Sequence, residues 1–176
     1  HEVVVMEEQA RICDTTFGFI PGGVNGPAFF HGTASPEQLK RWMPGIAAGK
    51  QMLCVCITEP DAGTDVKAMR TTARREGDEY VLNGNKIFIT LGQQADLALV
   101  AARTGAPGSG AKGISLFMVE TAKTPGFKVN KVLEKIGQNA MNTAEIFLED
   151  ARVPAENLIG GVEGKGFFQL MDVFTR

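Results

Sequence analysis

Between residues 51 and 158, hydrophobic positions alternate with polar ones or form short apolar blocks. Alternation is typical of β-strands, whose successive side chains point to opposite faces of a sheet. The pattern predicts strands over residues 52–58, 71–75, 79–82, 85–90, 95–103, 113–120, 126–132 and 144–149. Many short strands at this spacing indicate a small antiparallel β-barrel or sandwich.

Apolar residues recur at helical spacing near both ends of the chain. One such stripe consists of Met6, Ala10, Cys13 and Phe17, and another of Phe167, Leu170, Met171 and Phe174. A third helix is predicted to begin at residues 35–38, where Ser-Pro-Glu-Gln combines an N-cap, a proline in the first turn and a capping-box glutamine. Pro44 is expected to break or kink this helix. The fold class is therefore mainly β with flanking α-helices.

The most informative segment follows the first predicted strand. Alternation there places Leu53, Val55 and Ile57 on one face, and Cys54, Cys56 and Thr58 on the other. Pro60 ends the strand because it cannot donate to the ladder. In the following loop, 59–65, Gly63 lets backbone N–H groups turn toward a phosphate, and Thr64 adds a hydroxyl donor.

Asn83-Gly84 is a strong hairpin signal, so we expect a β-turn there. The return strand would carry Lys86, Phe88 and Thr90 on one face, with neighbouring members of that row roughly 7 Å apart. Such an aromatic ring and hydroxyl suit a flat heteroaromatic ligand with a polar edge. Taken alone, the pair is explained better by a core phenylalanine beside a threonine of ordinary β-propensity.

Composition excludes several classes of function. The chain has 176 residues, is 44% hydrophobic and 22% charged, and has a formal charge of −2. This balance fits a globular protein and gives no long-range attraction for nucleic acid or anionic membranes. No apolar run approaches the ~18 residues of a membrane span. The three cysteines and two histidines lack the spacing of a metal site, so we expect no metal ion. We also expect a reducing location, which is the cytoplasm or, if the protein is eukaryotic, the mitochondrial matrix.

Several ordered motifs resemble those of acyl-CoA dehydrogenases. They lie at residues 57–65, 82–90 and 147–154, with further similar segments at 113–120, 125–127, 134–137 and 163–167. The family consists of flavoproteins with an N-terminal helical domain, a middle β-barrel and a C-terminal helical bundle. The resemblance implies a fragment: the end of the N-terminal domain at 1–50, the flavin- and acyl-CoA-binding barrel at 51–160, and the truncated start of the C-terminal domain at 161–176.

The resemblance also implies an activity and a cofactor. Members of the family use FAD in fatty-acid β-oxidation: a base removes the α-proton of an acyl-CoA thioester, and the β-hydrogen leaves as hydride to flavin N5, giving the 2,3-enoyl-CoA. Carried over by position, the FAD contacts are Ile57 and Thr58 at the pyrimidine edge, Gly63 and Thr64 at the pyrophosphate, Phe88 over the ring, and Ile89 and Thr90 at the N5 side. Thr64 would also contact the acyl-CoA substrate.

Three positions depart from the family's usual residues. Phe88 stands where tryptophan is common, Asp61 where glycine often follows Thr-Glu-Pro, and Asn139 where arginine is common. Phenylalanine keeps the stacking surface but lacks an N–H. Asp61 is expected to point to solvent, because a carboxylate beside a pyrophosphate is unfavourable. Acyl-chain preference stays open.

The resemblance places the catalytic base in the C-terminal bundle, so no catalytic residue is assigned here. Glu59 and Glu163 fit structural roles, in a turn and at a helix start. We expect the fragment alone to be inactive and to bind FAD weakly, and the full-length protein to be a homo-tetramer or dimer that passes electrons to a flavoprotein. Alternatives are an acyl-CoA oxidase, a flavin-dependent monooxygenase, or a non-catalytic flavin- or CoA-binding module.

Overall fold

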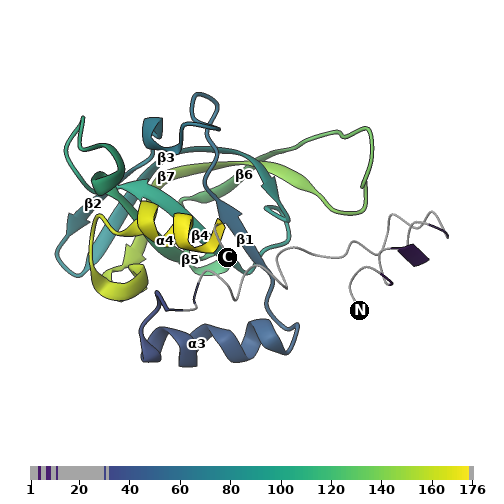
Figure 1. Ribbon diagram of the computed structural model, residues 1–176, viewed down its shortest axis with the longest axis horizontal. Coiled ribbons are helices and arrows are strands. Elements are labelled where there is room, and N and C mark those ends of the chain that lie inside the picture. The colour runs from purple at the N-terminus through teal and green to yellow at the C-terminus, as the bar shows by residue number, and fades with distance from the viewer. Residues whose placement is uncertain (1–3, 5–6, 9–10, 12–29, 31, 175–176) are drawn as a thin grey trace.

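The computed structural model describes residues 4, 7–8, 11, 30 and 32–174. The stripe that predicts the first helix, Met6, Ala10, Cys13 and Phe17, lies outside the described residues. Within the described part, a curled sheet is flanked by helices α3 (Pro36–Ala47) and α4 (Gly166–Phe174) (Figure 1). The expected class, mainly β with flanking α-helices, is confirmed.

Seven strands form the sheet. They are β1 (Leu53–Cys56), β2 (Thr72–Glu76), β3 (Glu79–Thr90), β4 (Leu97–Arg103), β5 (Ile114–Glu120), β6 (Phe127–Val132) and β7 (Thr143–Pro154). Their order is β1-β4-β2-β3-β7-β6, and β5 pairs with β4 as well. The sheet is mixed rather than purely antiparallel as expected, because β1 and β2 both run parallel to β4.

The parallel pairs have a simple cause in the path of the chain. β1 pairs with residues 97–100 of β4, and β2 begins beside Arg103 at the far end of the same strand. β5 pairs with β4 over its whole length, which leaves one edge of β4 for β1 and β2. The connection 57–71 therefore leaves the sheet after β1 and returns farther along the same edge.

Strand β4 is buried on both faces. Ala98, Val100 and Ala102 belong to the core inside the curled sheet, which also contains Cys54 and Cys56. The other face of β4 belongs to a second core, which the helices cover through Trp42 and Ile46 of α3 and Leu170 of α4, with Leu53, Leu97 and Leu99 beneath them. A strand covered on both sides is apolar throughout, which explains the sequence Leu-Ala-Leu-Val-Ala-Ala.

Helix α3 begins where the sequence predicts. Ser35 Oγ accepts a hydrogen bond from Gln38 N at 3.2 Å, and Ser35 N donates to Gln38 Oε1 at 3.0 Å. Gln38 Nε2 also donates to the carbonyl oxygens of Glu156 and Leu158, so that the cap ties the helix to the segment after β7. The expected break at Pro44 is wrong, since the helix continues through it to Ala47. Pro44 lacks only its own N–H bond, and its carbonyl still accepts from Ala48 N at 3.1 Å.

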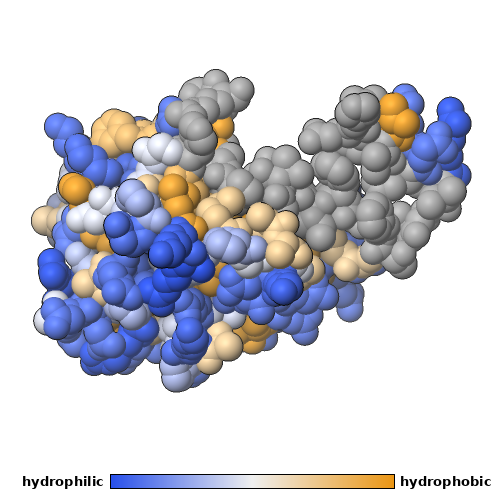
Figure 2. Space-filling view, turned by 90° about the horizontal axis from the view of Figure 1, so that it is seen from below, coloured by the Kyte–Doolittle hydropathy of each residue, from blue (hydrophilic) through white to orange (hydrophobic). Residues whose placement is uncertain are grey.

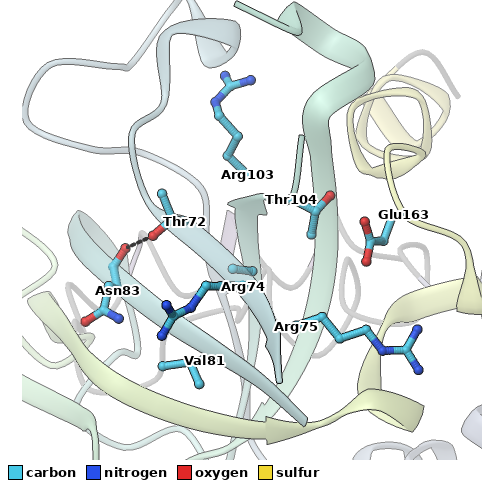
Figure 3. Close-up of a pocket in the computed structure, with 9 residues that line it drawn as sticks. Thr72, Arg74, Arg75, Val81, Asn83, Arg103, Thr104 and Glu163 are labelled. Atoms are coloured by element: carbon cyan, nitrogen blue, oxygen red, sulfur yellow. Dashed lines mark hydrogen bonds between the residues drawn. The ribbon is translucent and has the colours of Figure 1, made fainter. Parts of the chain in front are cut away.

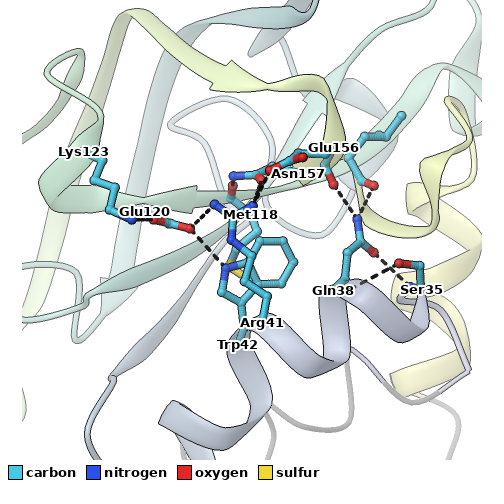
Figure 4. A network of polar contacts seen from close by, with 10 residues as sticks. Ser35, Gln38, Arg41, Trp42, Met118, Glu120, Lys123, Glu156 and Asn157 are labelled. Carbon is cyan, nitrogen blue, oxygen red and sulfur yellow. Dashed lines mark hydrogen bonds and ion pairs between the residues drawn. The ribbon is translucent and has the colours of Figure 1, made fainter.

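A polar network fixes α3 to the end of β5 (Figure 4). Arg41 contacts Glu120 and Glu156, each at 2.6 Å, and Trp42 Nε1 donates to Glu120 Oε1 at 3.3 Å. The indole is otherwise buried in the second core. The side of the molecule that carries α3 is predominantly hydrophilic in Figure 2, as expected for a helix with one apolar face.

The expected hairpin at Asn83-Gly84 is wrong. Strand β3 runs through both residues, and the turn lies at residues 77–78, between β2 and β3. Asn83 instead holds a β-bulge in β7: its side chain donates to Asp150 Oδ1 at 3.0 Å and accepts from Asp150 N at 2.9 Å. Gly84 is required by a close approach, because a Cβ there would lie 2.7 Å from Thr71 Cα.

Gly84→Ala should therefore destabilise the fold by about 1–3 kcal/mol, the usual cost of forcing extra atoms into a packed site. Chemical denaturation monitored by circular dichroism measures this change. Gly137→Ala is the matched control, since a Cβ at that position meets nothing within 4 Å, and it should leave the free energy of unfolding unchanged. Equal stabilities of the two variants would contradict the close approach.

Candidate functional site

The predicted phosphate loop lies within the connection 57–71, and a buried ion pair closes that connection. Lys86 Nζ on β3 lies 2.8 Å from Glu59 Oε1 and donates to the carbonyl oxygen of Ile57 at 3.0 Å. Glu59 also accepts from the backbone N–H groups of Arg70, at 2.6 Å, and Thr71, at 3.0 Å. One carboxylate thus joins the two ends of the loop to each other and to β3.

Both charges of this pair are withdrawn from water: Lys86 is 0% exposed and Glu59 is 6% exposed. Burial lowers the pKa of Lys86 below its ordinary value, and the Glu59 charge offsets part of that effect. Burial alone would raise the pKa of Glu59, but the Lys86 charge and the hydrogen bond from Arg70 outweigh it, so this pKa lies below its ordinary value. Glu59 is held as a carboxylate and serves a structural role, as expected.

Arg103 makes a second anchor for the same loop at the end of β4. Its guanidinium donates to the carbonyl oxygen of Met69 at 3.2 Å and to that of Lys67 at 2.6 Å. It also donates to Ser109 Oγ and to the Gly110 carbonyl, each at 3.2 Å. The returning part of the loop is therefore fixed to the β4–β5 connection as well as to β3.

The tip of the loop is open. Glu59 and Ala62 exchange two backbone hydrogen bonds, of 3.0 and 3.1 Å, which make a tight turn. Gly63 and Thr64 follow on the exposed side, and a Cβ at Gly63 would meet nothing within 4 Å. Asp61 is exposed and forms an ion pair with Arg70 at 3.3 Å, so its carboxylate points to solvent as expected.

Phe88 occupies an unusual position on β3. Its φ is 60°, in the left-handed region that residues with a Cβ rarely adopt, and its side chain is 64% exposed. The strand bulges here, because two residues lie opposite Glu145 between the pairs Lys86–Ile146 and Ile89–Ala144. Strained, exposed residues of this kind are concentrated at ligand sites.

The bulge changes the predicted faces of β3. Lys86 was expected beside Phe88 and Thr90, but Lys86 is buried and Phe88 is exposed, while Thr90 is half-buried. The extra residue moves Ile89 to the inside, where its side chain joins the core and is 2% exposed. Any contact from Ile89 to a ligand therefore involves its backbone.

Ile57 and Thr58 lie beside the start of the bulge. Ile87 N donates to the carbonyl oxygen of Thr58 at 2.9 Å, which brings the segment just after β1 next to Phe88. Thr58 is half-buried, and Ile57 packs against the second core while its carbonyl accepts from Lys86. The structure thus brings Ile57 and Thr58 close to Phe88. The loop that carries Gly63 and Thr64 is joined to the same part of β3 through the contact between Glu59 and Lys86.

Comparison with known proteins identifies the family to which this sequence belongs. The family model described as "Acyl-CoA dehydrogenase, middle domain" matches residues 54–151. The chain belongs to the acyl-CoA dehydrogenase family. It is 42% identical over 169 residues to the mitochondrial long-chain specific acyl-CoA dehydrogenase of Sus scrofa, covering 96% of this chain and 39% of that protein.

Solved structures of the family agree with this membership. An acyl-CoA dehydrogenase from Geobacillus kaustophilus superposes with a TM-score of 0.79 at 43% identity, over 84% of this chain and 38% of that one. Butyryl-CoA dehydrogenase from Megasphaera elsdenii gives a TM-score of 0.81 at 36% identity, over 86% and 39% of the two chains. The chain therefore spans about two fifths of the length of these family members.

The described residues include no group of three or more histidine, cysteine or acidic side chains placed to hold a metal ion.

Cys54 and Cys56 are free, buried thiols with their sulfur atoms 3.7 Å apart. The hydrogen bond with Cys56, together with burial, raises the pKa of Cys54 well above its ordinary value. No helix in the described ranges is long and apolar enough to cross a bilayer.

A pocket of about 510 Å³ lies apart from the residues of the predicted flavin site (Figure 3). Its lining comes from β2, β3, β4 and the segment before α4: Thr72, Ala73, Arg74, Arg75, Val81, Asn83, Arg103, Thr104 and Glu163. The residues of this cluster are scattered through the chain, so no motif in the sequence predicts it. Glu163 was expected at a helix start, but it precedes α4 in a turn and accepts a hydrogen bond from Tyr80 Oη at 2.5 Å.

The contact between Tyr80 and Glu163 can be measured directly, since Tyr80 is the chain's one tyrosine. Burial, followed by the hydrogen bond and charge of Glu163, raises the pKa of Tyr80 to about 12 from an ordinary value of 10.0. An alkaline titration followed by tyrosinate absorbance should have its midpoint there. Glu163→Gln should move the midpoint toward 10.0, because the negative charge is removed, while the exposed Glu134→Gln should not. An unchanged midpoint in Glu163→Gln would contradict the contact.

Proposed function

We propose that this chain is the flavin- and acyl-CoA-contacting part of an FAD-dependent acyl-CoA dehydrogenase. The observation that carries the proposal is the placement of Phe88, an exposed and strained aromatic residue, beside Thr58, two residues after β1, and the loop that the Lys86–Glu59 pair closes. An apolar ring kept in solvent at a conformational cost contributes nothing to the core, whereas it suits the face of a flat ligand.

The residues present fit FAD. Phe88 offers a stacking surface, and Thr58 and Thr90, which are half-buried residues outside the two cores, each carry a hydroxyl group. The open space at Gly63, with the Thr64 hydroxyl next to it, leaves room for a pyrophosphate to approach the backbone. In this assignment the Ile57 and Ile89 contributions come from the backbone, since both side chains pack inward.

The proposed reaction converts an acyl-CoA thioester to its 2,3-enoyl-CoA by loss of an α-proton and a β-hydride. FAD supplies the acceptor for the hydride. The chain's own residues would bind and orient the reactants: Phe88 would exclude water from one face of the ring, Thr58 would donate to its pyrimidine edge and Thr90 at its N5 side, and Thr64 would contact both the pyrophosphate and the substrate. Glu59 and Glu163 are committed to Lys86 and Tyr80, so neither is assigned as the base, which we place in a further domain.

The same proposal includes the oligomeric state, the electron acceptor, the cellular location and the domain limits of the enzyme. We propose that it works as a homo-tetramer or dimer, passes electrons to an electron-accepting flavoprotein, and is located in the cytoplasm or, in a eukaryote, in the mitochondrial matrix. The domain limits follow the same scheme, with the barrel at 51–160 between helical segments at 1–50 and 161–176. The location is supported by the mitochondrial relative from Sus scrofa, and the presence of further domains by the length of that protein, of which this chain covers 39%.

Phe88→Ala should weaken FAD binding by about tenfold, because the loss of one aromatic contact costs roughly 1–2 kcal/mol. Titration of FAD with the protein, followed by quenching of flavin fluorescence, measures the dissociation constant. Phe88→Trp should retain the affinity. Phe168→Ala is the matched control, since Phe168 is also exposed, on α4, and its removal should change nothing. Equal affinities for Phe88→Ala and the control would refute the assignment.

Gly63→Ala tests the pyrophosphate end of the same site. The added methyl group meets no protein atom within 4 Å, so the melting temperature should stay the same. It would nevertheless occupy the space through which a phosphate approaches the loop, and FAD affinity should fall several-fold. Calorimetric titration with FAD and a thermal melt separate these two effects. Unaltered affinity would remove Gly63 from the proposed contacts.

A further inference from the structure

Lys86 is a costly residue at its position. Its ammonium group is 0% exposed and must be desolvated, and burial lowers its pKa. Replacement of a buried ion pair by apolar side chains of similar size is often neutral or stabilising in proteins. Stability alone therefore does not account for a buried lysine here, and its contacts suggest another role.

Those contacts connect the parts of the proposed flavin site. On one side, Lys86 binds the carbonyl of Ile57, directly before Thr58. On the other, it binds Glu59, which in turn holds both Arg70 and Thr71 at the end of the loop. Lys86 itself lies two residues before Phe88, at the pair of residues where the bulge begins.

The ammonium group therefore sets the distance between three ligand-facing features. These are Thr58, two residues after β1, the loop that carries Gly63 and Thr64, and the exposed ring of Phe88. No apolar side chain reproduces this, because an ammonium group has three N–H donors and can bind a carbonyl and a carboxylate at the same time. A neutral pair would fill the space but would leave the Ile57 carbonyl and the loop without a shared partner.

We propose that Lys86 is a positioning residue: through Ile57 and Glu59 it holds the pyrophosphate loop and Thr58 in register with Phe88, so that all three contact one FAD molecule. The inference rests on the proposed flavin function and goes beyond it in one respect. It assigns the buried ion pair to the geometry of the site rather than to the stability of the fold.

A double-mutant cycle separates these two roles. Lys86→Met and Glu59→Gln should each lower the melting temperature, because each leaves one buried charge without its partner. The double variant contains neither charge and should regain most of the melting temperature. Its affinity for FAD should nonetheless stay about tenfold or more below that of the unaltered protein, because the link between Ile57 and the loop is still missing. Recovery of FAD affinity together with stability would overturn the inference.

Arg41→Met is the matched control for a lost ion-pair contact away from the site. Arg41 holds α3 to β5 through Glu120, and its loss should lower the melting temperature without changing FAD affinity. If Arg41→Met weakened FAD binding as much as Lys86→Met, affinity would simply follow stability, and the positioning role would be refuted.

A measurement without flavin keeps the inference separate from the proposed function. In native-state hydrogen exchange, the amides of Arg70 and Thr71 should lose protection in Lys86→Met and in the double variant, while amides of β4 and β5 keep theirs. Failure of the unaltered protein to bind FAD would refute the proposed function, and the amides would still test whether Lys86 positions the loop. Unchanged protection of Arg70 and Thr71 in both variants would overturn the positioning role.

Discussion

The organisation of this molecule depends on the buried pair formed by Lys86 and Glu59. A charge without a partner in the interior is so unfavourable that each of these residues requires the other. Because Glu59 also accepts two backbone N–H groups at the far end of its loop, that requirement fixes the path of the chain between β1 and β2. The geometry of an exposed loop is thereby determined from within the core, where positions are least variable.

A second feature on which the structure depends is backbone strain at the end of β3. Phe88, in the strand, and Leu91, directly after it, have φ angles of 60° and 62°, although neither residue is glycine. Such conformations persist where the surroundings determine them more strongly than local preference does. Here β3 pairs with β7 on both sides of the bulge, and Asn142 accepts from Leu91 N through its carbonyl and from Gln93 N through its side chain. The framework therefore holds the segment 88–91 in one conformation, which suits a contact surface for a rigid ligand.

The sequence was sufficient for most elements, because their signals are local. Seven of the eight predicted strand ranges begin within about two residues of the first residue of an observed strand. The start of α3 is predicted from its capping residues alone. Asn83-Gly84 misled the prediction because its turn signal is equally local, whereas its actual roles are long-range: Asn83 binds Asp150 across the sheet, and Gly84 faces Thr71. Long-range contacts of this kind leave no periodic trace in the sequence.

In the candidate site, too, local sequence signals were informative, whereas long-range contacts could not be predicted. Thr58, Gly63, Thr64 and Phe88 could be singled out from motifs, but the burial of Lys86 could not, since alternation places it on the face of Phe88. A single inserted residue reverses the faces of a strand, and a bulge is invisible to a period-two pattern. The signal that could have found it is chemical: a lysine within an apolar strand needs an acid, and Glu59 directly follows Thr58, whose carbonyl accepts from Ile87 N. The need of a charged residue in an apolar strand for a partner is thus a signal that hydrophobic patterning alone does not provide.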